Sequence, residues 1–227
     1  MQAGNDDAQN GRTGPRLRLA LIAVLALGLS GCGGISLLGG GGGPPPRLYD
    51  LSPKSTFEPA IPEVSWQLVV EEPFAPSAIS TDRVAVRTGP FEFAYYEGVR
   101  WSDRAPRMVQ TLLVESFENS GKITAVGRQA IGLRSDFELK TELREFQALM
   151  SGGQDGAPLV WVRMNFKMVA QPSAQIIALQ TFDSRVQAAD DRMSSIVMAF
   201  DEALGDVMKD GVAWTLTTGE RHDRSKR

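Results

Sequence analysis

The sequence predicts an α+β domain in which two helices pack on one face of a mixed, mainly antiparallel sheet. Segments within residues 48–95 and again within 135–186 alternate apolar and polar residues, as strands with one buried face do. Two other stretches, at 106–119 and 191–214, place apolar residues at helical spacing along a single stripe. Packing both helices on the same face of the sheet hides both stripes from water.

The first half of the predicted domain contains four short strands and one helix. The strands are expected at residues 48–51, 66–70, 83–87 and 91–95, with Gly89-Pro90 as the turn between the last two. The helix begins near Pro106 after a cap by Ser102 or Asp103. Asn119-Ser120-Gly121 is a typical stop signal, so the helix is expected to end there.

The second half contains three longer strands and a closing helix. The strands are expected at residues 135–146, 160–168 and 177–181, and Phe182 and Val186 indicate a bulge in the third. Asp190 or Asp191 caps the final helix, which runs to about Trp214. The polar residues 217–227 are predicted to be a disordered tail.

The N-terminal 31 residues have the composition of an export signal. Arg12, Arg16 and Arg18 precede the apolar run 19–29, and the small residues Ser30 and Gly31 follow it. The run is shorter than the ~20 residues that a membrane-spanning helix needs. We therefore predict a signal peptide over residues 1–31.

A flexible tether is expected between this signal and the domain. Gly39–Gly43 and then Pro44–Pro46 dominate residues 32–47, and such sequences form linkers. A phosphate-binding loop is excluded because no Gly-Lys-Ser/Thr follows the glycines. The folded domain should accordingly occupy residues 48–216.

The overall composition excludes several classes of function. One Cys and one His among 227 residues make neither an intramolecular disulfide nor a zinc site, and no cofactor is expected. The 24 Lys and Arg are slightly outnumbered by 27 Asp and Glu, so net charge does not favour nucleic acid as a partner. The single Cys must serve another purpose.

Leu29-Ser30-Gly31-Cys32 closely resembles the lipobox of bacterial lipoproteins. The resemblance implies cleavage between Gly31 and Cys32, attachment of diacylglycerol to the Cys32 thiol, and acylation of the new amine. Stable membrane attachment needs more than one acyl chain, which agrees with this chemistry. Gly33 in place of Asp, by resemblance to enterobacterial sorting, implies the periplasmic face of the outer membrane.

The order of features after the lipobox resembles the ABC-type transport auxiliary lipoprotein component family. The features span about residues 48–214 and are Leu48–Pro53, Arg83–Arg87 before an aromatic strand, Arg100–Pro106, the charged strand 137–146 and the helix running into Trp214. The resemblance implies an accessory lipoprotein of a Pqi-type system. It would dock on a periplasmic MCE-domain protein and, through it, an inner-membrane permease and ATPase that move lipids or hydrophobic compounds. The alternative is a structural envelope lipoprotein that scaffolds an unrelated complex.

The candidate docking residues are Tyr95, Tyr96, Arg100, Trp101 and Arg104. Tyr, Trp and Arg dominate the energetics of protein interfaces, which favours a partner surface here. The alternative for Trp101 and Tyr96 is that they pack in the core. The alternative for Arg100 and Arg104 is that they are ordinary solvent-exposed surface residues. The charged strand 135–146 is the expected edge for pairing subunits into a homo-oligomer.

Catalysis is not expected from this sequence. The sole His, His222, lies in the predicted tail, so a Ser-His-Asp arrangement lacks its base. Asp190-Asp191 is better explained as a helix cap, and Glu71-Glu72 as charge at a strand end. A direct lipid carrier would need an apolar cavity, whereas the apolar stripes of this chain are expected to be used in its own core.

Overall fold

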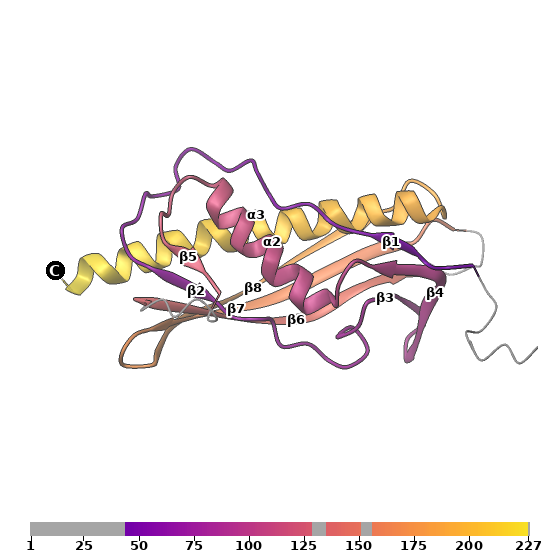
Figure 1. Ribbon diagram of the computed structural model, residues 1–227, viewed down its shortest axis with the longest axis horizontal. Helices are drawn as coiled ribbons and strands as arrows, with labels where there is room; N and C mark the ends of the chain where they lie inside the picture. Colours follow the sequence, from indigo (N-terminus) through magenta and orange to yellow (C-terminus); the bar gives the residue numbers. More distant parts are fainter. Residues whose placement is uncertain (1–43, 129–134, 151–155, 227) are drawn as a thin grey trace, which may run out of the picture. The chain divides into compact units, whose positions relative to one another are not determined.

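A central strand, β6 (Phe137–Leu149), organises the sheet in the computed structural model, which describes residues 44–128, 135–150 and 156–226. The elements are shown in Figure 1. In chain order they are β1 (Arg47–Tyr49), β2 (Leu68–Val70), β3 (Arg83–Gly89), β4 (Glu92–Trp101), α2 (Ala105–Asn119), β5 (Val126–Gly127), β6, β7 (Leu159–Ala170), β8 (Gln175–Gln187) and α3 (Met193–Lys226).

Both edges of β6 are paired with other strands, and the directions of these neighbours determine whether the sheet is parallel, antiparallel or mixed. β7 pairs along one edge, while β2 and β3 share the other, near the start and the end of β6 respectively. β8 lies beyond β7, β5 beyond β2, and β4 and then β1 beyond β3.

Four of the seven strand pairs in the described residues are parallel, so the prediction of a mainly antiparallel sheet is wrong. The cause is the position of α2 in the chain. Both β2 and β3 are separated from β6 by that helix, and a crossover of this length returns the chain in the same direction. Hairpins make only the β3–β4, β6–β7 and β7–β8 pairs.

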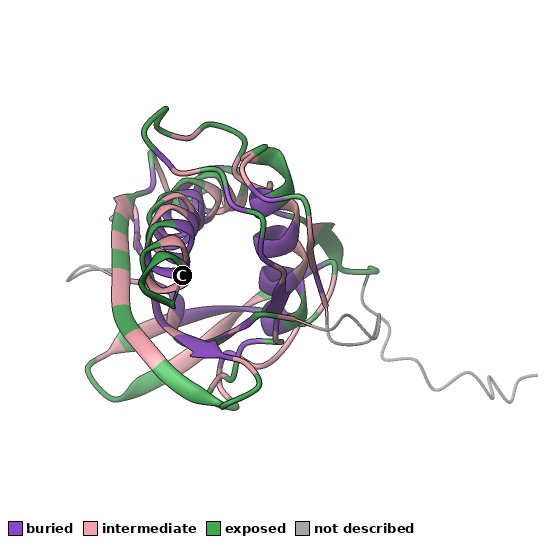
Figure 2. Cartoon of the chain, turned by 90° about the vertical axis from the view of Figure 1, so that its left-hand side faces the viewer, coloured by how far each residue is buried: buried purple, intermediate pink, exposed green. Residues whose placement is uncertain are grey.

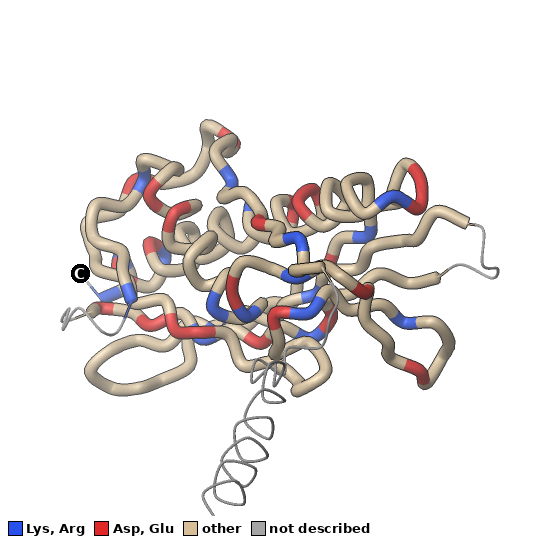
Figure 3. Tube along the Cα trace, turned by 45° about the vertical axis from the view of Figure 1, so that its right-hand side comes forward, with Lys and Arg blue, Asp and Glu red and all other residues tan. Residues whose placement is uncertain are grey.

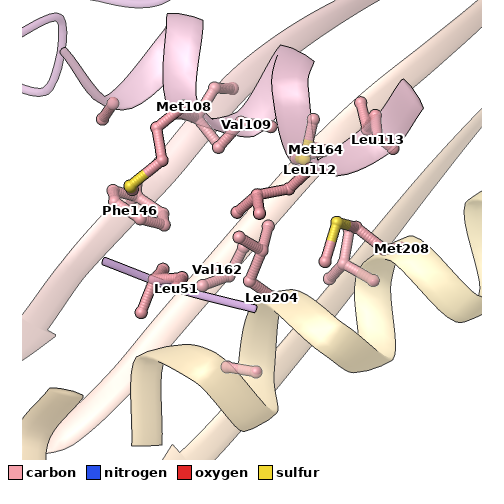
Figure 4. Close-up of a cluster of buried hydrophobic side chains, with 14 of the residues drawn as sticks. Leu51, Met108, Val109, Leu112, Leu113, Phe146, Val162, Met164, Leu204 and Met208 are labelled. Atoms are coloured by element: carbon pink, nitrogen blue, oxygen red, sulfur yellow. The ribbon is translucent and has the colours of Figure 1, made fainter. Parts of the chain in front are cut away.

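Both helices lie on the same face of the sheet, as predicted, and the sheet curls around them into a half-barrel (Figures 1 and 2). The residues of β7 that face the helices, from Val160 to Ala170, are almost completely buried. In Figure 4, Leu112 of α2 points toward Leu204 of α3 and Val162 of β7, which lie side by side. Each side chain of this size contributes about 1.5–3 kcal/mol when fully buried, so this layer supplies most of the stabilisation of the fold.

The ends of α2 confirm one sequence prediction and correct another. The helix ends at Asn119, and Gly121 beyond it has a φ of +62°, which favours glycine. At the start, neither Ser102 nor Asp103 caps the helix with its side chain. Asp103 instead forms an ion pair with Arg107, one turn along, at 3.3 Å.

The predicted disordered tail is wrong, because α3 continues to Lys226. Thr218 and Gly219 are buried, and the ring of His222 lies edge-on to Phe137 with 5.9 Å between centroids. Past Trp214 the buried stripe of the helix contains Leu216, and beyond it only the small residues Thr218 and Gly219. Glycine and threonine have low hydrophobicity, so the sequence pattern ends before the packing does.

The predicted bulge in the third long strand lies elsewhere. Phe182 and Val186 pair in unbroken register with Met164 and Val160. The register of β7 with β8 instead shifts at Ile177, beside the turn. All residues from Ala178 onward therefore alternate regularly between the face toward α3 and the outer face.

Close contact at Gly219 leads to a stability prediction. A Cβ at this position would lie 2.4 Å from Cζ2 of Trp66 and 2.6 Å from Cε of Met168. We expect Gly219→Ala to destabilise the domain by about 1–3 kcal/mol, because overpacking outweighs the better helix propensity of alanine. Urea unfolding followed by circular dichroism measures the change.

Gly205→Ala in the same helix is the matched control. Its nearest neighbouring atom would be Cδ of the flexible Lys54 side chain at 3.8 Å, so we expect stability to stay equal or rise by up to about 1 kcal/mol. Wild-type stability in Gly219→Ala would show that the end of α3 is not docked on the sheet.

Candidate functional site

The predicted lipidation site, Gly31 and Cys32, lies outside the described residues. The candidate docking residues are all described. Tyr95, Tyr96, Arg100 and Trp101 belong to β4, and Arg104 immediately precedes α2. The structure does not bring them together into one surface.

Trp101 belongs to the core. It is 1% exposed, and its ring lies 5.6 Å from that of Phe146 and 5.1 Å from that of Phe200, between centroids. The alternation of β4 directs Trp101 inward together with Val99. The docking role predicted for this residue is therefore wrong, and its alternative place in the core is correct.

Arg100 and Arg104 are exposed, but both hold the preceding loop. Nη1 of Arg100 donates to both carboxylate oxygens of Asp82 at 2.8 Å. Nη2 of Arg104 donates to Oγ of Ser80 at 2.6 Å. These contacts fasten residues 80–82 to the end of β4, so both guanidinium groups already have partners within the chain.

Tyr96 lies beside the point where the chain enters the domain. Its hydroxyl is buried without a hydrogen-bond partner among the described residues, and burial raises the pKa of Tyr96 to about 12. Tyr96 and Arg100 border a pocket of about 370 Å³, together with Pro44, Pro46, Arg83, Glu97, Gly98 and Val99. The end of the predicted tether thus runs along two of the predicted site residues.

Tyr95 belongs to a surface that the sequence prediction covered only in part. Its hydroxyl donates to the carbonyl of Ala78 at 3.0 Å, and the guanidinium of Arg83 lies 3.7 Å above its ring. One step along the hairpin, the guanidinium of Arg87 lies 4.8 Å from the ring centroid of Phe93. Phe91, at the turn, is fully exposed.

We call Arg83, Arg87, Phe91, Phe93 and Tyr95 the hairpin surface. Cross-strand pairing of Arg87 with Phe93, and of Ala85 with Tyr95, places Arg87, Phe93 and Tyr95 on one face of the β3–β4 hairpin. Arg83 joins them through its contact with the Tyr95 ring, and Phe91 lies at the turn. In Figure 1 this hairpin extends away from α3. The signal available in the sequence was the period-two spacing of Phe91, Phe93 and Tyr95 opposite two arginines. It indicated a strand, but the sequence prediction assigned no role to four of these five residues.

The outer face of the central strands carries paired charges. Lys140 contacts Glu71 at 2.7 Å and Glu138 at 3.6 Å, and Glu142 binds both Arg144 and Lys167. Hydrogen bonds from Lys167 and Arg144 lower the pKa of Glu142, and the bond to Glu71 raises the pKa of Lys140. Figure 3 shows acidic and basic residues interspersed along this face. Mixed pairs of this kind present no single-sign field to a polyanion.

The described residues contain no group of three or more His, Cys, Asp or Glu side chains placed to hold a metal ion. Among the helices of that same part of the chain, none is both long enough and apolar enough to cross a membrane.

Comparison with known families decides the affiliation. The model of the ABC-type transport auxiliary lipoprotein component family matches residues 49–210. The chain belongs to this family. The resemblance inferred from the sequence over residues 48–214 is thereby confirmed, and with it the general role of an auxiliary lipoprotein of transport systems.

Individual relatives agree with the fold but carry no assigned activity. An uncharacterized protein of Bradyrhizobium diazoefficiens is 25% identical over 178 residues, which are 78% of this chain and 47% of that protein. The chain thus spans about half the length of this curated relative.

Two solved structures are similar to the domain. A Xanthomonas campestris protein of the DUF330 family is 32% identical, with a TM-score of 0.74 over 78% of this chain and 99% of its own. A second, uncharacterized protein is 16% identical with a TM-score of 0.55, over 79% of this chain and 99% of its own, and shows the fold alone.

The buried hydroxyl of Tyr96 gives a pH-dependent prediction. An unfolded tyrosine ionises near pH 10, whereas folded Tyr96 ionises near 12. Between these values the unfolded chain releases a proton that the folded chain keeps, so stability is complete below pH 10 and is lost as pH rises toward 12. Tyr96→Phe should abolish this part of the loss.

The measurement is urea unfolding of wild type and Tyr96→Phe at pH 7 and pH 11. At pH 7 we expect the variant to equal wild type or exceed it by up to about 1 kcal/mol, because an unpaired buried hydroxyl is removed. At pH 11 its advantage should be larger. Tyr49→Phe is the control, and an equal loss of stability in wild type and Tyr96→Phe would contradict the prediction.

Proposed function

We propose that this chain is a non-catalytic docking subunit of an MCE-type ABC transport system that moves lipids or hydrophobic compounds across a Gram-negative envelope. In this proposal the lipid on Cys32 holds it at the periplasmic face of the outer membrane. The hairpin surface contacts the periplasmic MCE-domain protein, which links it to the inner-membrane permease and ATPase. The hairpin surface is the observation that carries the proposal.

The chemistry of the hairpin surface favours binding over catalysis. Its groups are two guanidinium ions and three aromatic rings, which offer no acid or base near neutral pH. Arg, Tyr and other aromatic side chains are the residues that contribute most to interface energies. The fully exposed ring of Phe91 gains about 25 cal/mol for each Å² that a partner covers.

The arginines of this surface are already ordered. Arg83 and Arg87 lie over the rings of Tyr95 and Phe93, and Arg87 also contacts Glu145 at 3.6 Å. Side chains held in place before binding lose less conformational entropy when a partner arrives. The surface therefore suits a partner with carboxylates or backbone carbonyls around an apolar centre.

The docking prediction is tested with Phe91→Ser in the full-length lipoprotein. Because Phe91 is fully exposed, we expect stability to change by less than about 0.5 kcal/mol. Binding to the MCE-domain protein should weaken at least about tenfold, which is the cost typical of a central interface residue. Affinity purification from detergent-solubilised envelopes, with mass spectrometry of bound proteins, measures it.

Met198→Ser is the matched control, because Met198 is another exposed apolar residue (71%) but lies on α3. It should bind like wild type. Equal recovery of the MCE-domain protein by Phe91→Ser would refute the role of the hairpin. If wild type recovers only other envelope proteins, the alternative of a structural scaffold for an unrelated complex replaces the transport proposal.

The anchor is tested with Cys32→Ser. Without the thiol no diacylglycerol can be attached, so we expect an uncleaved chain that keeps residues 1–31 and is absent from the outer membrane. Sucrose-gradient fractionation and mass analysis of the N-terminal peptide measure both effects. Gly33→Asp is the companion variant and should be lipidated but retained in the inner membrane. Outer-membrane fractionation of Cys32→Ser would contradict the anchor.

A further inference from the structure

The free edge of the sheet is β8, not the strand that the sequence indicated. The predicted edge strand, 135–146, corresponds to β6, which is paired along both edges. That prediction is wrong because alternation shows which strand has a wet face but not which strand has a free edge. Within the described residues, β8 pairs only with β7.

β8 lacks most of the features that usually protect an edge strand, and the register shift at Ile177 is the exception. It is 13 residues long, contains neither Pro nor Gly, and carries one acid, Asp183, and one base, Arg185. Ile176 and Leu179 are 56% and 63% exposed. Proteins normally blunt such edges with prolines, charges or short strands, because a long apolar edge pairs readily with another chain.

A groove runs beside this edge. It has a volume of about 320 Å³ and lies between the start of β8 and the last turns of α3, where it is lined by Ile177, Ala178, Trp214, Thr218, Arg221, His222 and Ser225. The side from β8 is apolar, and the side from α3 ends in basic and polar groups. In the described residues Arg221 has neither a hydrogen bond nor an ion pair, and Nε2 of His222 has no partner.

We propose that β8 and the last turns of α3 form a strand-addition site for an extended peptide segment of a partner protein. The peptide backbone pairs with the free edge of β8. One apolar side chain enters the groove against Ile177 and Trp214, and a carboxylate on the same face of the peptide binds Arg221. In this mode of recognition, backbone hydrogen bonds give affinity and side-chain pockets give specificity.

The chemistry of the groove favours a different protein over a second copy of this chain. The side chains of an added strand alternate between the two faces of the sheet, as those of β8 do. Only the residues on the face toward α3 can therefore reach the groove. In β8 that side carries Phe182, whose ring centroid lies 6.3 Å from that of Trp214, while Asp183, opposite Arg163 in the strand register, is on the outer face. A second β8 therefore cannot bring its only carboxylate to Arg221.

The experiment uses the full-length lipoprotein in detergent micelles and a phage library of random twelve-residue peptides. We expect selection of peptides that alternate apolar residues and carry an acid at one end. Binding of the selected peptide, labelled for fluorescence anisotropy, should weaken at least about tenfold in Arg221→Glu, because a charge-assisted hydrogen bond is lost. Lys226→Glu, at the same helix end but outside the groove, should change it by about twofold at most.

Two further measurements separate strand addition from adhesion to a basic surface. The selected peptide with alternate backbone amides N-methylated should not bind, because its hydrogen-bond donors are removed. Hydrogen exchange should slow in β8 when the unmodified peptide is bound.

Three outcomes would overturn the proposal. First, the N-methylated peptide binds as tightly as the unmodified one. Second, Ile177→Lys selects the same peptides as wild type. Third, β8 in the free chain becomes more protected from hydrogen exchange as the protein concentration rises, which would mean that a second copy covers the edge. None of these measurements uses the MCE-domain protein, so their failure is distinct from failure of the docking role of the hairpin.

Discussion

The fold depends on how closely α3 approaches the sheet. Two glycines on this helix, Gly211 and Gly219, lie where any Cβ would meet the ring of Phe166 or that of Trp66. Their absence of side chains allows one helix of 34 residues to lie along the whole curled face of β7. Because α3 and α2 pack on that face of the sheet, the β3–β4 hairpin and the edge of β8 stay available for binding.

The surfaces that remain differ in how their charges are used. Along β6 and β7, Lys140 pairs with Glu71, and Glu142 pairs with Arg144 and Lys167. These side chains are partly exposed, so each pair contributes about 1 kcal/mol at most. On the hairpin, Arg83 lies over Tyr95 instead of a carboxylate, and its charge remains available. At the far end of α3, Arg221 is likewise uncompensated within the described residues. Each of the two proposed binding surfaces thus combines an arginine that lacks a carboxylate partner in the described residues with neighbouring apolar groups.

Sequence periodicity predicted those elements whose partners lie nearby in the chain. The alternation of Phe137, Leu139 and Leu143 indicated β6, and Gly121 indicated the end of α2. Strand partners could not be predicted in the same way, since parallel pairing of β2 and β3 with β6 depends on where α2 crosses the sheet.

The candidate site was predicted less well, for three physical reasons. A tryptophan such as Trp101 suits both a core and an interface, and only the direction of its strand decides between them. The end of α3 is held by glycine and threonine, whose contacts depend on close approach rather than hydrophobicity. The hairpin surface and the edge of β8 arise from pairing across strands, so no single segment contains their pattern.

The two proposed surfaces lie at opposite ends of the central strands. The hairpin joins the sheet beside Ala148 and Leu149 of β6, whereas the start of β8 lies level with Phe137 and Leu139, two strands away. Twelve residues of strand at ~3.3 Å each separate these ends by about 40 Å. A partner at one surface therefore leaves the other accessible, and their contributions to binding should be additive.

The chain enters the domain through β1, which pairs with β4 at the base of the hairpin. The hairpin thus lies at the end of the sheet where β1 begins the described domain, and the β8–α3 groove lies at the opposite end.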